Sequence, residues 1–180
     1  MKKRFLIIRL GAIGDIIHSL PIASAIKDFM PSAEIVWLVE SIYAEILQGN
    51  PDIDQILTVD SKLLRKKINL NAISEFLCSL KELKSLSPDV AIDPQGLIKS
   101  GFLSFLSGAK TRVGFEQNLC RERANALFSN KYAAPADLKS HVIKKNLSLL
   151  KPLKIPIPEY KDFRFPLIEN REEFEKAESF

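Results

Sequence analysis

The sequence predicts an α/β protein with an open, mostly parallel sheet that helices cover on both faces. Short apolar runs alternate along the chain with segments whose apolar residues recur at helical spacing. The runs are apolar almost throughout, which is typical of strands buried on both faces. Helices that cross between such strands produce parallel pairs. A chain of 180 residues is long enough for one large domain of this kind and short for two.

The expected strands and helices alternate from the N-terminus onward. Apolar runs predict strands at residues 4–10, 34–40, 54–60, 88–96 and 110–115, the fourth of them ending in a turn. Helices are predicted at residues 16–30, 41–48, 71–86, 97–108 and 121–128. Within the first helix, Pro21 is expected to force a kink or a restart, because proline lacks the N–H that an interior helical position donates.

The C-terminal part is predicted to be helical and then irregular. After a linker, a long helix is expected from about Ala136 to Leu150. The proline-rich segment at residues 151–160 is expected to contain no helix. Residues 162–167 are expected to add a last short strand, and residues 169–180 a terminal helix.

Composition indicates a soluble globular protein. Hydrophobic residues make up 46% of the chain and charged residues 27%, and the net charge of +4 does not by itself select a partner. Cys78 and Cys120 form no CxxC pair, so both thiols are expected to be free in a reducing compartment. The apolar run after the basic N-terminus is too short for a signal peptide, and no stretch approaches a spanning helix. We expect a cytoplasmic protein that does not cross a membrane.

Three loops are expected at the functional edge of the sheet, since ligands of open parallel sheets bind beyond the carboxyl ends of the strands. They are residues 11–15, 59–67 and 93–100. The first loop contains Gly11, Gly14 and Asp15, and it lacks both the third glycine of a dinucleotide fingerprint and the Gly-Lys-Ser/Thr of a Walker loop. A carboxylate at the start of a helix would also repel a phosphate. Asp15 is therefore either an N-cap residue or a general base that accepts a proton from a substrate hydroxyl.

The second loop carries a basic cluster made of Lys62, Arg65, Lys66 and Lys67. Such a cluster is usually a solvated face, but at this edge it also suits a ligand with phosphates or carboxylates. Aromatic or glycine-rich RNA-binding signatures do not accompany it. We therefore favour an acidic small or lipid-borne ligand over nucleic acid.

In the third loop, Gln95 presents an amide and Lys99 a charge in the first turn of the following helix. Gln95 is either a ligand contact or a turn residue that bonds its own backbone. His18 and His141 have no His or Cys near them in the sequence, so a metal site is not expected. Trp37 lies in an apolar run and is predicted to be a core residue.

Taken together, these segments resemble the lipopolysaccharide heptosyltransferases, the family-9 glycosyltransferases. The resemblance rests on LIIRLGAIGDIIHSLPIASAI, IVWLVE, AIDPQGLIKSG, TRVGF and CRERANALF, and it extends from the N-terminus to about Leu150. Within the family, the sequence is most similar to the type that adds the first heptose to the Kdo–lipid A inner core.

The resemblance implies a GT-B fold, in which two Rossmann-like domains face each other across a cleft. It implies inverting transfer without a metal or cofactor. The N-terminal domain would hold the acceptor, Kdo–lipid A, and the C-terminal domain would bind the donor, ADP-heptose. Asp15 falls on the aspartate of the family's G-D-x-x-H-x-L-P motif and would be the general base.

The resemblance also assigns Lys62, Arg65, Lys66, Lys67, Arg121 and His141 to the acceptor side. The loops at the functional edge add Gly14, Gln95 and Lys99 to the candidate acceptor-binding residues. Kdo carboxylates and lipid A phosphates would explain why this side is basic. A lipid-borne acceptor further implies peripheral contact with the cytoplasmic face of the inner membrane.

We expect residues 1–160 to form a Rossmann-like acceptor-binding domain, and residues 161–180 a terminal strand and helix leading towards a donor domain that this sequence lacks. The chain alone is therefore expected to be inactive. Two alternatives stay open: a non-catalytic module that binds acidic glycolipid, and a nucleotide-binding Rossmann domain, which Asp15 and the missing third glycine disfavour.

Overall fold

The structure is a computed structural model that describes residues 2–60, 70–133 and 141–167, without the side chains of residues 70–76. Its centre is a parallel sheet of β1 (Arg4–Ile8), β2 (Glu34–Glu40), β3 (Gln55–Val59), β4 (Val90–Ile92), β5 (Thr111–Phe115) and β6 (Lys131–Ala133). The strands lie in the order β3-β2-β1-β4-β5-β6. The predicted fold class, an open parallel sheet, is confirmed.

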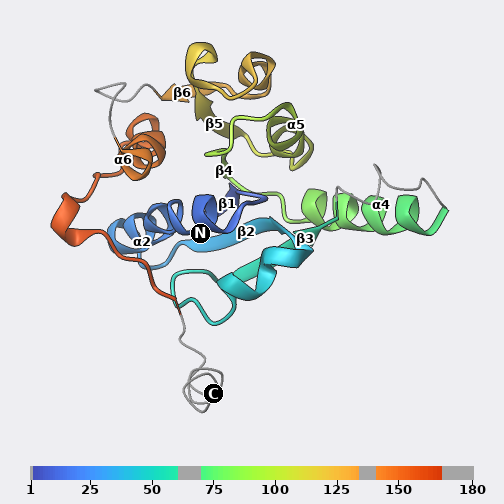
Figure 1. Cartoon of the computed structure of the whole chain (residues 1–180), viewed down its shortest axis with the longest axis horizontal. Helices are drawn as coiled ribbons and strands as arrows, with labels where there is room; N and C mark the ends of the chain where they lie inside the picture. The colour runs from blue at the N-terminus through green and yellow to red at the C-terminus, as the bar shows by residue number, and fades with distance from the viewer. Residues whose placement is uncertain (1, 61–69, 134–140, 168–180) are drawn as a thin grey trace, which may run out of the picture.

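Helices cover both faces of this sheet (Figure 1). Helices α1 (Ile13–Ile17), α2 (Leu20–Phe29) and α6 (Val142–Leu147) pack on one face, and α4 (Leu70–Ser85) and α5 (Ile98–Leu106) on the other. Successive residues of a strand point to opposite faces, so Phe5 and Ile7 of β1 belong to the first core and Leu6 and Ile8 to the second.

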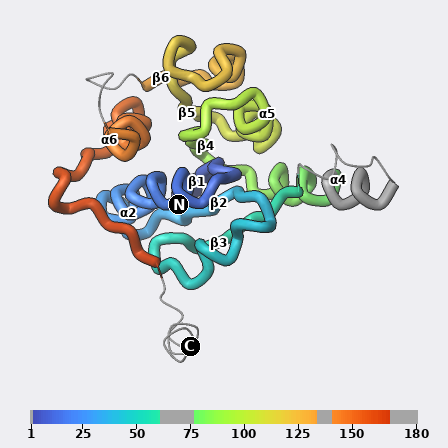
Figure 2. The backbone as a smooth tube through the Cα atoms, in the orientation of Figure 1, coloured from blue at the N-terminus to red at the C-terminus, as the bar shows by residue number. Residues whose placement is uncertain are grey.

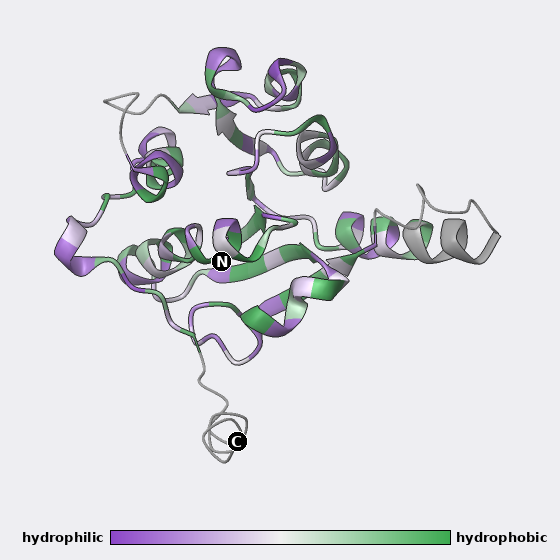
Figure 3. Ribbon diagram, in the orientation of Figure 1, coloured by the Kyte–Doolittle hydropathy of each residue, from purple (hydrophilic) through white to green (hydrophobic). Residues whose placement is uncertain are grey.

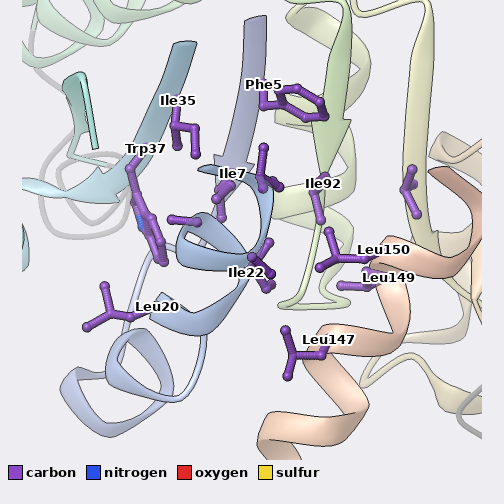
Figure 4. Close-up of a cluster of buried hydrophobic side chains, with 14 of the residues drawn as sticks. Phe5, Ile7, Leu20, Ile22, Ile35, Trp37, Ile92, Leu147, Leu149 and Leu150 are labelled. Atoms are coloured by element: carbon purple, nitrogen blue, oxygen red, sulfur yellow. The ribbon is translucent and has the colours of Figure 1, made fainter. Parts of the chain in front are cut away.

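The first core is the larger of the two. In Figure 4, Trp37 of β2 lies on the side of Ile35 and Leu20, whereas Leu147, Leu149 and Leu150 lie on the opposite side near Ile92. Trp37 is fully buried, and its Nε1 donates a hydrogen bond to the carbonyl of Arg9 at 3.3 Å. The prediction that Trp37 is a core residue is confirmed. The central strands β1 and β2 are mostly apolar in Figure 3, whereas the helices alternate apolar and polar segments.

Pro21 divides the first predicted helix as expected. Helix α1 ends at Ile17, and α2 begins at Leu20 with the proline in its first turn, where a missing N–H costs nothing. The segments expected to be helical at 41–48 and 121–128 are 3₁₀-helices, η1 (Ser41–Leu47) and η3 (Arg123–Phe128). A third 3₁₀ turn, η2 (Gln117–Leu119), follows β5, and the three-residue edge strand β6 lies in what the sequence indicated was a linker.

The long helix expected from Ala136 to Leu150 is wrong in extent. Residues 134–140 lie outside the described residues, and α6 begins at Val142 with His141 as its N-cap. A 3₁₀-helix, η4 (Ser148–Leu153), continues it and contains Pro152, so the expectation of no helix within residues 151–160 is also wrong. Pro152 has no N–H to donate to the carbonyl of Ser148, and its ring would clash with that carbonyl in an α-helix, so the α-helical geometry does not continue through this turn.

The strand expected at residues 162–167 is absent from the described chain. A 3₁₀ turn, η5 (Tyr160–Asp162), precedes an extended segment that pairs with no strand. Side chains attach this segment instead: Asn50 donates to the carbonyl of Pro166 at 2.7 Å, and Arg164 pairs with Asp28 at 2.6 Å. Figure 2 shows the segment returning past α2 towards the turn before β3. The terminal helix expected at 169–180 lies outside the described residues, and the domain boundary at residue 160 stays a prediction.

Both cysteines are free thiols, as expected, with Cys78 exposed and Cys120 half-buried. None of the helices in the described ranges combines the length and the apolar character that a membrane span needs.

The strand order reverses between β1 and β4, because β2 and β3 extend the sheet in one direction from β1 and β5 and β6 in the other. The helix that follows β1 packs on one face of the sheet and the helix that follows β4 packs on the other. A crevice therefore opens between the loops that follow these two strands. The fold therefore brings together the loops after β1 and β4, which are two of the three loops that the sequence placed at the functional edge.

Candidate functional site

The loops after β1 and β4 are joined by two buried hydrogen bonds. The backbone N–H of Leu10 donates to Oε1 of Gln95 at 2.9 Å, and Nη1 of Arg9 donates to the carbonyl of Pro94 at 2.8 Å. The side chain of Gln95 thus bonds across to the β1 loop, so its interpretation as a turn residue bonding its own backbone is wrong. These two contacts fix the floor of the crevice.

Asp93, the first residue after β4, is fully buried and anchors the second loop. Its carboxylate accepts hydrogen bonds from four donors: Gln95 N at 2.9 Å, Gly96 N at 3.2 Å, Ser100 Oγ at 2.9 Å and Asn125 Nδ2 at 2.7 Å. Burial raises the pKa of Asp93, and the four donors act in the opposite direction. The Asn125 bond attaches η3, which comes 32 residues later in the chain, to the β4 loop.

Gly96 allows the segment before η3 to approach this loop closely. Its φ of +69° favours glycine, and a Cβ there would lie 3.2 Å from the backbone nitrogen of Arg121. The N–H of Glu122 donates to the Gly96 carbonyl at 3.0 Å, and its Oε2 accepts from the N–H of Ile98 at 2.5 Å. Arg121 is thereby carried to the edge of the crevice.

Asp15 lies in the first turn of α1 and does not cap it. The N-cap residue is Ala12, which makes no side-chain cap bond. Oδ2 of Asp15 instead forms ion pairs with Nη2 of Arg9 and, at 3.0 Å, with Nη2 of Arg121. The interpretation of Asp15 as an N-cap residue is therefore wrong. Its carboxylate is held between two guanidinium groups whose residues are far apart in the sequence.

The two arginines differ in their surroundings. The side chain of Arg9 is 2% exposed, whereas that of Arg121 is 55% exposed. Burial lowers the pKa of Arg9, Asp15 raises it, and the charge of Arg121 lowers it. Arg9 is thus a fixed cation beneath Asp15, and Arg121 a solvent-facing one beside it. Sequence reasoning missed Arg9, although a charged residue inside an otherwise apolar strand run was a signal for it.

A small hollow of about 40 Å³ lies beside the two arginines that hold this carboxylate. Its walls come from the β1 and β4 loops, the segment between β5 and η3, and α6, and they comprise Arg9, Pro94, Gln95, Phe115, Leu119, Arg121, Val142, Lys145 and Asn146. Three of these side chains are cations and two are amides. Such a set suits a ligand group that carries a carboxylate or a phosphate.

Lys145 adds the third cation, and sequence reasoning did not connect it to the site. Its Nζ donates to the carbonyl of Leu119 at 3.0 Å and lies 4.8 Å from the centre of the Phe115 ring. Burial lowers the pKa of Lys145, and the nearby arginines lower it further, whereas Cys120 raises it. Only the packing of α6 beside the β5 end of the sheet could have shown this.

Helix α6 also brings the two histidines together. The His18 and His141 rings lie edge to face with their centres 5.7 Å apart, and Asn146 donates to the His18 carbonyl at 3.1 Å. The sequence indicated that neither histidine has a His partner, and this is wrong: α1 and α6 are far apart in the sequence but adjacent in the fold. No group of three or more His, Cys, Asp or Glu side chains gathers within the described ranges, and the prediction of metal-free chemistry stays a prediction.

The remaining predicted site residues are placed as follows. Nζ of Lys99 donates to Oε1 of the buried Glu40, at the end of β2, at 2.8 Å. Gly14 lies in α1 facing open space, since a Cβ there would meet no atom within 4 Å. Lys62, Arg65, Lys66 and Lys67 lie outside the described residues. The described structure thus brings Asp15, Gln95 and Arg121 to one site and places His141 on the helix that supplies Lys145.

Comparison with known proteins places this architecture in a family. The model described as glycosyltransferase family 9 (heptosyltransferase) matches residues 78–179, which is more than half of the chain. This chain belongs to glycosyltransferase family 9.

Relatives of this family-9 chain include two proteins named lipopolysaccharide heptosyltransferase 1. The one from Pseudomonas aeruginosa is 28% identical over 158 residues, covering 87% of this chain and 44% of the relative. The one from Campylobacter coli is 34% identical over 116 residues, covering 64% and 32%. A solved structure of the Escherichia coli heptosyltransferase WaaC with ADP superposes with a TM-score of 0.79 at 25% identity and covers 87% of this chain and 49% of that one.

The family-9 chain therefore spans less than half the length of these curated relatives, and its fold corresponds to about half of the WaaC structure. This agrees with the prediction that the sequence contains one Rossmann-like half of a two-domain GT-B fold.

Proposed function

We propose that this chain is the acceptor-binding half of an inverting heptosyltransferase that transfers heptose from ADP-heptose to Kdo of the Kdo–lipid A inner core. The observation that carries the proposal is the Asp15 carboxylate, which lies at the switch point of the sheet beside a cationic hollow. Membership of glycosyltransferase family 9 and the names of the relatives support the heptose chemistry.

Asp15 acts as the general base of this reaction. Its Oδ2 is held by Arg9 and Arg121, and no hydrogen bond or ion pair within the described residues involves Oδ1. Oδ1 accepts the proton of the acceptor hydroxyl as that oxygen bonds to the anomeric carbon of heptose. The bond from this carbon to the ADP oxygen breaks on the opposite side, so the configuration inverts and ADP leaves with the electron pair.

The cationic hollow orients the acceptor. A Kdo carboxylate next to Arg121 and Lys145 would place a neighbouring hydroxyl at Asp15, and Arg9 keeps the base fixed from below. Arg121 is free to rotate towards the ligand because it is largely exposed, and an exposed ion pair costs little to break. In a two-domain GT-B enzyme, ADP-heptose would be held mainly by the second domain. The proposed reaction uses no metal or cofactor and takes place at the cytoplasmic side of the membrane.

The proposal is tested in two steps. First, titration of the chain with a soluble Kdo disaccharide and with ADP-heptose should give acceptor binding and weak or no donor binding. Reversed preferences, or measurable binding of NAD or ATP, would instead favour the nucleotide-binding Rossmann alternative.

Second, heptose transfer is measured in a protein that adds the donor half to this chain. Asp15→Asn should lower kcat by roughly 10²–10⁴-fold and leave acceptor affinity within a few fold. Asp162→Asn, at an exposed aspartate that does not line the hollow, is the matched control and should be unchanged. Near-normal turnover of Asp15→Asn with intact acceptor binding would favour the non-catalytic glycolipid-binding module.

A further inference from the structure

A second surface exposes large apolar side chains. Ile98, Phe102 and Phe105 of α5, Leu127 of η3 and Tyr132 of β6 are each between 45% and 81% exposed. The three α5 residues follow one another by four and then three positions, so they share one face of the helix. The opposite side of the helix packs on the sheet through the buried Leu103. We call the surface formed by these five residues the α5–η3 face.

Ring contacts link α5 to η3 within this face. The ring of Phe128, on η3, lies 6.0 Å from that of Phe102 and 6.4 Å from that of Phe105. Tyr132 donates its hydroxyl hydrogen to the carbonyls of Ala126, at 3.2 Å, and Ser129, at 2.9 Å, so its ring lies against η3. Contiguous apolar surface of this kind on a soluble protein marks a contact with a partner or a membrane.

The segment that contains this face is basic, although Lys99 and Arg121 within it pair with Glu40 and Asp15. Residues 98–133 carry six basic and two acidic residues, so their net charge of +4 equals that of the whole chain. The basic residues are Lys99, Lys110, Arg112, Arg121, Arg123 and Lys131. Lys110, Arg123 and Lys131 are exposed, and the guanidinium of Arg112 lies 5.5 Å from the centre of the Phe105 ring. The rest of the chain carries equal numbers of positive and negative charges.

We propose that the α5–η3 face docks on an anionic lipid bilayer. Its aromatic and aliphatic side chains enter the headgroup region, and the surrounding cations contact lipid phosphates. Aromatic side chains favour the membrane interface, and each nearby cation strengthens binding to anionic lipid. A bilayer suits this combination of exposed rings, many cations and few carboxylates better than a protein does. The acidic groups of a protein partner would have to match the cations one by one.

The docked orientation would serve the proposed function. Ile98, at one end of the face, donates its N–H to Glu122, the residue after Arg121. The face therefore begins beside the crevice, and the sugar of an acceptor embedded in the bilayer could reach Asp15 without its lipid leaving the membrane. Only this step rests on the proposed function; docking itself does not require it.

The test is flotation of the chain with vesicles that contain no acceptor sugar, made of phosphatidylcholine alone or mixed with phosphatidylglycerol. We expect binding to the anionic vesicles, weakened by high salt. The double variant Phe102→Ser, Phe105→Ser should reduce binding by about tenfold or more. Phe29→Ser is the matched control, since Phe29 is 50% exposed on α2, a different part of the surface, and it should bind normally.

A second pair of variants tests the charges without altering the core. Lys110→Glu with Lys131→Glu should weaken binding by at least fivefold for each residue, because each cation near an anionic surface contributes about 1 kcal/mol. The control reverses two exposed lysines of α4, Lys81→Glu with Lys84→Glu, and should keep most of the binding. Circular dichroism and thermal unfolding confirm that each variant is folded.

Absence of binding to anionic vesicles, or equal losses in the test and control variants, would overturn the proposal. Concentration-dependent dimerisation that Phe102→Ser, Phe105→Ser abolishes would show that a second copy of the chain covers the face, and would also overturn it. Asp15→Asn should bind vesicles normally. A failure of docking is therefore distinguishable from a failure of the proposed catalysis.

Discussion

Asp15 and Asp93 follow neighbouring parallel strands at the same edge of the sheet, yet their surroundings differ completely. Asp93 is fully buried and accepts four hydrogen bonds from nearby backbone and side-chain donors. Asp15 faces the crevice and pairs through one oxygen with Arg9 and Arg121. The first arrangement uses the whole carboxylate for structure, whereas the second leaves part of it available to a ligand. Position at the functional edge thus does not by itself make an aspartate catalytic.

The two aspartates are also connected. Asp93 holds Asn125 and the turn at Gly96, which together position the segment that carries Arg121 over Asp15. Gln95, in the Asp93 turn, holds the β1 loop from which Asp15 projects. Asp93 therefore acts as a positioning residue for Asp15. Variants of Asp93 should mainly lower stability, whereas variants of Asp15 should mainly affect function.

The largest effect on stability is expected from Asp93→Asn. The amide NH₂ would meet donors where the carboxylate accepts, leaving buried groups unsatisfied, and we expect the free energy of unfolding to fall by about 2–4 kcal/mol. Urea denaturation followed by circular dichroism measures this. The exposed Asp162→Asn should stay within about 0.5 kcal/mol of the unchanged chain. An equally small change at Asp93 would contradict its anchoring role.

Gln95→Leu should have the next largest effect. It removes the acceptor of the buried Leu10 N–H, at a cost of about 1–3 kcal/mol in unfolding free energy. Gln95→Glu keeps an oxygen in place and should retain most of the stability, so the difference between the two variants isolates this hydrogen bond. If both lose the same amount, the bond between the two loops does not hold the crevice together.

Asp15→Asn should lower the unfolding free energy less, by about 1–2 kcal/mol at most. The amide oxygen can still accept from both guanidiniums, and Arg121 is exposed to water, although Arg9 loses its counter-charge. The same urea titration measures it. A loss as large as that of Asp93→Asn would place Asp15 among the structural residues and weaken its assignment as the base.

The smallest effect is a pH dependence of anion binding at the hollow. Burial lowers the pKa of Lys145 below its ordinary 10.5, so its positive charge is lost at a lower pH than that of an exposed lysine. Acceptor affinity should therefore decline by up to about tenfold at a pH where an exposed lysine is still charged.

Titration calorimetry of a soluble Kdo acceptor over alkaline pH measures this decline. Lys145→Met should bind more weakly and show a flatter profile, whereas Lys144→Met, at the exposed neighbouring lysine, should keep it. A decline that persists unchanged in Lys145→Met would assign the titration to another group.

The sequence by itself determined the elements with strong apolar patterns and the edge at which the site lies. Local periodicity, which can be seen within a single segment, predicted three features. They are the strands around Leu6, Val36 and Val113, the helix restart at Pro21, and the position of Asp15 after the first strand. It failed where elements are short or depend on packing, as at β6, at the start of α6 and in the segment before Leu167.

Only the tertiary structure decided what each polar residue does. Arg121 reaches Asp15 from 106 positions away, Gln95 reaches Leu10 from 85, and Lys145 joins the hollow through the packing of α6. Such partnerships depend on the order β2-β1-β4, which places two distant loops side by side. The hydrophobic pattern fixes which residues are buried, but it does not fix strand order, and strand order determines which charges meet.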